Sequence, residues 1–326
     1  METRKFGRRS ALACVIVIAT FCGISTGQNS TWIGPAAGHW ADASNWDTPY
    51  WPGELVGGGA PTFYDARVDD NPAQDSAVTV DVSGALAVEL TLDEGDSVLV
   101  ADGGTLTVTG WTFNSGILRA DGGQALLNWY TENGGAEIVA GDGGRVTCKA
   151  VTGGTLTAEA GGQFVFGNAA ETFDGVTFNG PGDFYSRNTV SESFRVTIRD
   201  SVVNATITQQ KDGSNPARQE LVGTITHNGA LVVGEDCLLH PRGAVSLTAA
   251  TGQSGEIVMD AGAHLERRNG DATATALTLG PEQTVRGAGL ISGYATHAMA
   301  VVNNGVIRAE DRGADMVRHA RDHVEA

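Results

Sequence analysis

A sequence pattern of about 20 residues recurs four times in a row between residues 97 and 166. Its copies read SVLVADGGTLTV, GILRADGGQALL, EIVAGDGGRVTC and GTLTAEAGGQFVF. Asp102, Asp121, Asp142 and Ala160 mark the turn in each copy, so the steps are 19, 21 and 18 residues. These steps are too short for a pair of helices and match one coil of a β-solenoid.

The repeat predicts which side chains point into the solenoid. Residues at the same distance from successive turns form columns, and alternate residues of a strand point to opposite faces. Three columns are apolar and are expected inside: Leu106, Ala125, Val146 and Phe164; Val108, Leu127, Cys148 and Phe166; Val98, Ile117, Ile138 and Leu156. The Gly pair at each turn predicts a sharp corner between two strands, because glycine tolerates positive φ.

Composition agrees with an all-β chain. The sequence has 45 Gly against 9 Pro, and its Val, Thr and Leu residues stand in short runs broken by Gly, Asp and Asn. No long stretch with helical periodicity precedes residue 310. We therefore predict a single-stranded parallel β-helix, or β-solenoid, with coils of about 20 residues over residues 76–310.

Residues 1–27 have the features of a signal peptide. A basic start is followed by an apolar run, Ala11 to Ile24, which ends in small residues. We expect secretion, with the mature protein outside the cytoplasm or at the cell surface. No second long apolar stretch follows, so no membrane span is predicted for the mature chain.

The mature chain is strongly acidic. The formal charge is −17, and removal of four basic groups and one acidic group with residues 1–27 leaves −20. Such a chain is not expected to bind nucleic acid or anionic lipid. Asp102, Asp121 and Asp142 would stack at about 4.8 Å, the spacing of neighbouring strands. They serve either as turn formers without any cofactor or as ligands for calcium.

Two cysteines remain in the mature chain. Cys148 and Cys237 lie more than four coils apart, roughly 20 Å at about 4.8 Å per coil, which exceeds the ~7 Å that a disulfide can bridge. Neither belongs to a full set of Cys and His residues at zinc-binding spacing. Two free thiols are expected.

Residues 28–75 form a Trp-rich segment before the regular coils. Strands are expected only after this segment, from about Val78. Trp32, Trp40 and Trp46 either cap the open end of the solenoid or form a sugar-binding platform. This W-x-G…G-x-W…N-W element resembles the start of secreted bacterial β-helix proteins of the autotransporter-associated β-strand repeat type. RGAGLISG and VVNNGVIRAE, between residues 286 and 310, are similar to coil sequences of the same group. The resemblance implies a secreted β-helix.

Two segments depart from the repeat. Gln209 to Glu220 is polar and predicts a loop that projects from one coil. Residues 311–326 abandon the β pattern, either as a genuine tail or because the gene product is truncated. A solenoid that stops near Glu310 would expose unpaired strand edges, which predicts self-association through that end.

No catalytic residues are predicted. The sequence shows no nucleophile elbow, phosphate loop or triad spacing, and the arginines of the coils look scattered: Arg119, Arg145, Arg187, Arg195 and Arg199. Trp111, Trp129 and Tyr130 follow consecutive turns by eight or nine residues and should be neighbours, either packed inside or exposed for stacking on sugar rings.

The resulting hypothesis is a secreted, non-catalytic, structural or adhesive β-solenoid of the cell surface or extracellular matrix, whose partners are polysaccharide or surface components. The alternative is a polysaccharide-binding or polysaccharide-degrading β-helix enzyme. A coil face that gathers two or more carboxylates and a basic residue into a concave site would favour the enzyme.

Overall fold

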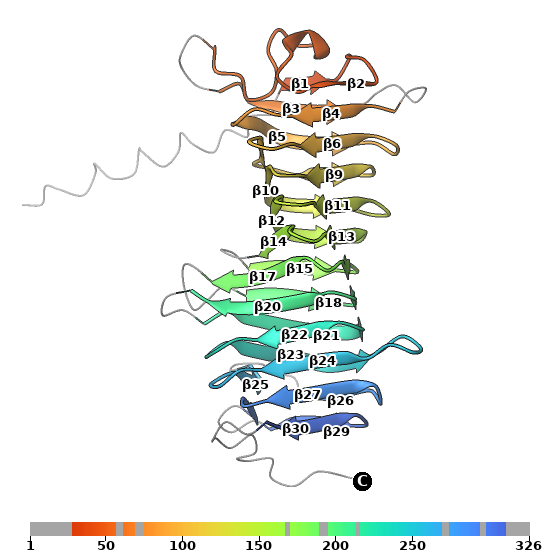
Figure 1. Cartoon of the computed structure of the whole chain (residues 1–326), viewed down its shortest axis with the longest axis vertical. Coiled ribbons are helices and arrows are strands. Elements are labelled where there is room, and N and C mark those ends of the chain that lie inside the picture. The colour runs from red at the N-terminus through yellow and green to blue at the C-terminus, as the bar shows by residue number, and fades with distance from the viewer. Residues whose placement is uncertain are drawn as a thin grey trace, which may run out of the picture.

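The protein is a parallel β-solenoid, seen in the computed structural model as a long column of stacked coils (Figure 1). The structure describes residues 28–56, 61–68, 75–166, 170–188, 195–212, 216–268, 274–293 and 298–310. The predicted signal peptide and the tail after residue 310 lie outside these ranges. The column has about 10 turns of roughly 22 residues, slightly longer than the 20 predicted.

Each regular coil has three sides, which we call faces A, B and C. Face A consists of β2 (Ala37–His39), β4 (Ala77–Val80), β6 (Ser97–Val100), β9 (Ile117–Ala120), β11 (Glu137–Ala140), β13 (Thr155–Ala158), β16 (Thr177–Asn179) and β19 (Val202–Val203). Face B consists of β7 (Thr105–Val108), β14 (Gln163–Phe166), β17 (Asp183–Asn188), β20 (Thr206–Lys211), β22 (Ala230–Val233), β24 (Gly255–Met259), β27 (Gln283–Gly287) and β30 (Val306–Ala309).

Face C begins with β1 (Gln28–Thr31) and β3 (Tyr64–Val68) and continues through β8 (Thr112–Asn114), β15 (Ala170–Asp174) and β18 (Arg195–Arg199). Three long strands serve face B with their first half and face C with their second: β5 (Ala85–Leu92), β10 (Gln124–Glu132) and β12 (Arg145–Thr152). Further along, face C is continued by the first halves of β21 (Arg218–His227) and β23 (Leu238–Thr248) and by β25 (His264–Glu266) and β28 (Leu290–Ser292). The second halves of β21 and β23, followed by β26 (Thr275–Leu279) and β29 (Met299–Asn303), continue face A.

An apolar column runs along the inside of face B through every coil from β5 to β30. Its members pair in register and are Ala85, Leu106, Ala125, Val146, Phe164, Phe184, Ile207, Leu231, Ile257, Val285 and Ile307. The first predicted column is therefore confirmed, and the described side chains before Ile307 are buried. The coils differ in length, since the step along the column is shortest from Val146 to Phe164 and longest from Ile257 to Val285.

The third predicted column is wrong at one position. Leu118, not Ile117, pairs with Val98 and Ile138, and Ile117 is 44% exposed. The reason is the corner Asp121–Gly123, which has three residues between its strands where the neighbouring corners have four. Counting back from the aspartate therefore places the column one residue too early.

The glycine pair at each corner has two separate causes. Gly143 has φ +66°, a conformation that favours glycine. At Gly144 the φ is ordinary, but a Cβ there would collide with the carbonyl oxygen of Ala120 in the preceding coil. The corners are therefore tight because successive backbones touch, and positive φ explains only the first glycine.

Trp32, Trp40 and Trp46 form a buried cluster at the N-terminal end. Their exposed fractions are 4%, 0% and 3%, and the Trp46 ring meets the other two edge-on at centroid distances of 5.4 and 4.9 Å. The Trp40 indole N–H donates to the carbonyl oxygen of Pro52 over 2.9 Å. This arrangement agrees with the predicted cap. Strands begin earlier than expected, because β1 to β3 already belong to the parallel sheet.

The predicted projecting loop at Gln209 to Glu220 is wrong at both of its ends. Gln209 belongs to β20 and Gln219 to β21, and both side chains are buried inside the solenoid, where Gln209 Nε2 donates to Gln219 Oε1 over 2.7 Å. The polar run misled because two of its amide groups are buried and hydrogen-bond to each other in the interior.

Cys148 and Cys237 are both buried free thiols, as predicted. Burial raises the pKa of each, so both behave as small apolar side chains. Among the described residues, no helix has the length and apolar character needed to cross a membrane.

Candidate functional site

Trp111, Phe113 and Tyr130 form an aromatic group on the outside of face C, in which Trp111 is exposed and the other two are half-buried. The Trp111 and Phe113 rings are parallel within 6° at a centroid distance of 5.9 Å, and Trp111 meets Tyr130 of the next coil at 4.8 Å. The Tyr130 hydroxyl donates to Thr152 Oγ1 over 2.7 Å, which fixes the Tyr130 ring against the following coil. We call these three residues and Trp129 the aromatic platform. Of its members, the sequence did not point to Phe113.

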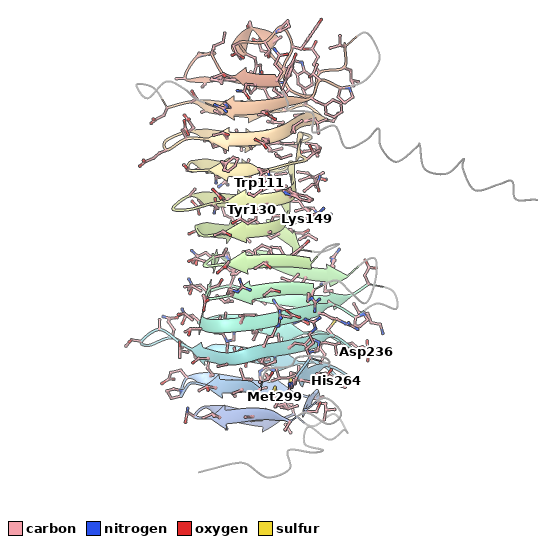
Figure 2. The ribbon with its side chains drawn as sticks, turned by 180° about the vertical axis from the view of Figure 1, so that it is seen from behind. Trp111, Tyr130, Lys149, Asp236, His264 and Met299 are labelled. Carbon is pink, nitrogen blue, oxygen red and sulfur yellow. The ribbon has the colours of Figure 1, made fainter. Side chains whose placement is uncertain are left out.

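Trp129 lies beside this group because of a β-bulge. Leu127 pairs with Cys148 and Tyr130 pairs with Ala150, so two residues of β10 oppose Lys149 alone. Trp111 is 38% exposed and Trp129 is 57% exposed. Interior packing, one of the two predicted alternatives, is therefore wrong for these tryptophans. Figure 2 shows Trp111, Tyr130 and Lys149 one after another along the column.

The register does not bring Asp102, Asp121 and Asp142 into one stack. A Cβ on Gly122 would meet Asp102, one on Gly141 would meet Asp121, and one on Gly161 would collide with Asp142, so each aspartate faces a glycine of the next coil. No group of three or more His, Cys, Asp or Glu side chains able to hold a metal occurs among the described residues. Calcium binding here stays an untested prediction.

Asp121 instead belongs to an ion-pair group. The Arg119 guanidinium lies 3.5 Å from the Asp121 carboxylate and reaches over Gly141 to Glu159, two coils away, at 2.6 Å. The hydrogen bonds to Glu159 raise the pKa of Arg119 and lower that of Glu159. Arg119 thus ties three coils together.

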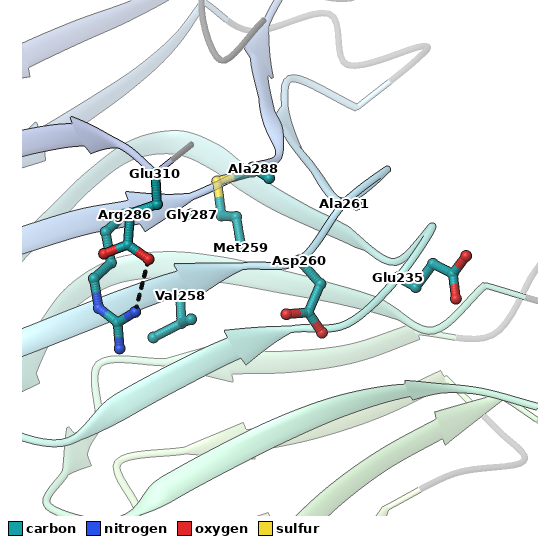
Figure 3. Close-up of a pocket in the computed structure, with 9 residues that line it drawn as sticks. All are labelled: Glu235, Val258, Met259, Asp260, Ala261, Arg286, Gly287, Ala288 and Glu310. Atoms are coloured by element: carbon teal, nitrogen blue, oxygen red, sulfur yellow. Dashed lines mark hydrogen bonds and ion pairs between the residues drawn. The ribbon is translucent and has the colours of Figure 1, made fainter. Parts of the chain in front are cut away.

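A concave corner of about 450 Å³ lies where the turns after β22, β24 and β27 stack (Figure 3). Its lining includes the carboxylates of Glu235, Asp260 and Glu310 and the guanidinium of Arg286. It therefore has the composition expected of a polysaccharide-acting enzyme. Arg286, however, is bound by both Glu256 oxygens at 2.5 and 3.1 Å and by Glu310 at 3.2 Å, and these contacts raise its pKa.

The two remaining carboxylates of this corner are exposed. Glu235 and Asp260 both stand on surface turns. A carboxylic acid that donates a proton at neutral pH is typically buried in an apolar site. The corner thus resembles a surface ion-pair group more than an acid–base site.

Three arginines gather on one carboxylate on face C, an arrangement that the sequence did not predict. Glu220, with 2% of its side chain exposed, is bound by Arg195 at 2.9 Å, Arg242 at 3.4 Å and Arg268 at 3.2 Å. Arg195 had looked like one of several scattered arginines. Consecutive coils of unequal length bring these side chains together, and no sequence spacing reveals them. We call this group the arginine cluster.

The column of face C that holds Glu220 continues with His240 in the next coil. Glu220 pairs in register with His240, whose Nδ1 lies 3.1 Å from the Glu266 carbonyl oxygen. His240 is 6% exposed, and burial lowers its pKa. Its neutral ring therefore serves as packing beneath the cluster.

Comparisons with protein-family models, with curated proteins and with solved structures find no match for this chain.

Proposed function

We propose that this protein is a secreted, non-catalytic structural and adhesive β-solenoid that binds polysaccharide at the aromatic platform. The single observation that carries the proposal is the exposure of Trp111 and Trp129 on consecutive coils beside Tyr130. Large aromatic side chains are normally buried, and an exposed aromatic patch with a polar rim is typical of a binding surface.

The geometry supports a sugar ligand in particular. Trp111 and Phe113 present parallel rings, and a pyranose ring can lie flat against such a surface. Tyr130 is held by Thr152, and the strands beneath the platform are fixed by inter-coil hydrogen bonds, so little conformational entropy is lost on binding. Lys149 and Glu132 supply polar groups nearby.

The solenoid itself suits a surface or matrix role. Continuous parallel ladders along the whole column give rigidity without a cofactor. The expected signal peptide and the resemblance to secreted autotransporter-associated repeat proteins support a place outside the cytoplasm. The concave corner at Arg286 favours the polysaccharide-degrading alternative by composition, but its arginine is already bound by two glutamates.

Affinity gel electrophoresis tests the proposal. The mature protein is run in gels that contain dextran, dextran sulfate, methyl-esterified pectin or polygalacturonate. We expect at least one polymer to retard the protein and the double variant W111A/W129A to lose about tenfold in affinity, equivalent to ~1.4 kcal/mol.

The matched control is F63A, because Phe63 is another exposed aromatic side chain, at 51%, that is not a member of the platform. Its retardation should equal that of the parent protein. No retardation in any gel, or equal retardation of the parent and W111A/W129A, would overturn the proposal.

A further inference from the structure

The aromatic platform and the arginine cluster share one face of the solenoid. Residues in successive coils of face C pair in register along a single outward column: Phe113, Glu132, Thr152, Asp174, Arg199, Val222 and Arg242. Five inter-coil steps separate Phe113 from Val222, so at about 4.8 Å per step the two groups lie roughly 24 Å apart.

Between them, this column holds the ion pair of Asp174 and Arg199, whereas the column beside it carries small described side chains. In the neighbouring column Tyr130 pairs with Ala150, and further along Thr172 pairs with Thr197, which pairs with Glu220. These intervening side chains are small. An extended polymer chain can therefore lie along face C, parallel to the axis, and touch both groups.

The arginine cluster has hydrogen-bond donors to spare. Arg195 and Arg268 each place one Nη1 on the same oxygen, Glu220 Oε1. A guanidinium has five N–H donors in a planar fork that matches carboxylate and sulfate groups. The buried Glu220 holds the two forks in place, and their side chains keep 28% and 32% of their surface exposed.

The overall negative charge of the chain does not prevent an anion from binding here. At physiological ionic strength, interactions between exposed charges are largely screened beyond about 8 Å. The field within that distance is set by nearby groups, and the three arginines on Glu220 outnumber the two carboxylates that act on the adjacent His240, Glu220 and Glu266.

We propose that the solenoid binds an acidic polysaccharide laid along face C, with sugar rings on the aromatic platform and a carboxylate or sulfate group on Arg195 and Arg268. This inference rests on the proposed function and adds the charge of the ligand. It also predicts the direction in which the polymer lies.

The test compares polymers that differ only in charge: dextran with dextran sulfate, and methyl-esterified pectin with polygalacturonate. We expect the acidic member of at least one pair to bind more than tenfold tighter, and the pair concerned identifies sulfate or carboxylate as the group. The double variant R195Q/R268Q should remove that preference and leave binding of the neutral member unchanged.

Two further variants control the result. R145Q/R308Q removes the same charge from face B and should keep the preference. R195K/R268K keeps the charge, loses the planar forks and should retain only part of the preference. Thermal unfolding checks that each variant is folded, and the lysine variant serves if the glutamine variant is not.

The outcomes separate the two proposals. If W111A/W129A loses binding but neutral and acidic polymers bind equally, the platform stands and the acidic ligand is overturned. If the acidic preference survives in R195Q/R268Q, the arginine cluster is not its source, which also overturns the inference.

Discussion

The coils before Phe164 and those after Ile207 solve the same packing problem with different side chains. The earlier coils are the shorter ones and carry Leu106, Ala125 and Val146 inside. The later coils are longer and bury polar side chains that meet across the interior, whereas the buried amides of the earlier coils, Asn114 and Asn133, stand at strand ends and bond to each other along face C. A cluster of phenylalanines fills the junction: Phe164, Phe166, Phe173, Phe178 and Phe184.

The later coils show that a wider interior accepts polar side chains when they are paired. Gln209 from face B meets Gln219 from face C across the interior. His227 and Gln283, two coils apart, are joined at 2.8 Å, and the contact passes beside Gly255, which has no side chain in the way. Gly141 allows Arg119 to reach Glu159 in the same manner. Glycine in this solenoid therefore also permits contacts that skip a coil.

The largest expected effect tests the apolar half. Val146→Asp places an unpaired carboxylate in a fully buried column and should destabilise the protein by about 4 kcal/mol or more. Urea unfolding measures the loss, and Gln124→Asp at an exposed position of the same face is the control. Unchanged stability of the Val146 variant would mean that the inward register is wrong.

An intermediate effect tests the polar half. Gln219→Leu leaves the buried amide of Gln209 without its partner and should cost about 2 kcal/mol. The double variant Gln209→Leu/Gln219→Leu removes both polar groups and should recover most of that loss, because a like-sized apolar pair has no polar group to satisfy. If the double variant is as unstable as the sum of the two single ones, the interior there requires polarity for another reason.

The smallest effect is a pH dependence confined to the later coils. Burial lowers the pKa of His227 below its ordinary value of 6.5. As the pH falls below about 6.5, the unfolded chain takes up a proton that the folded chain refuses, so stability present above that pH is lost.

Urea midpoints of the parent and His227→Gln, measured between about pH 7.5 and 5.5, isolate this contribution before the carboxylates titrate. The parent should lose unfolding free energy relative to His227→Gln as the pH falls. A difference that is constant over this range would show that His227 is not protonated on unfolding.

Much of the fold follows from local pattern. The two-residue alternation and the Asp-Gly-Gly corners predicted coil length, the inward column from Leu106 to Phe164 and the free state of Cys148 and Cys237. The tryptophan cap followed from the need to cover an open apolar end. The prediction failed where one corner is a residue shorter, at Ile117, and where the step lengthens and the inward residues become polar, at Gln209 and Gln219.

The candidate site, too, was predicted only in part from the sequence. Trp111, Trp129 and Tyr130 could be named from the sequence because they follow neighbouring turns by similar distances, so coils in register must bring them together. That Trp129 faces solvent was decided by the bulge opposite Lys149, which alternation alone does not specify.

The sequence by itself determined that this chain forms stacked parallel coils and which apolar columns hold them together, because those properties repeat at short range. Only the tertiary structure decided that Arg195, Arg242 and Arg268 meet at Glu220 on the same face as the aromatic platform. Their positions depend on the summed lengths of several unequal coils, and a difference of one residue in any corner turns a side chain from one face to the other.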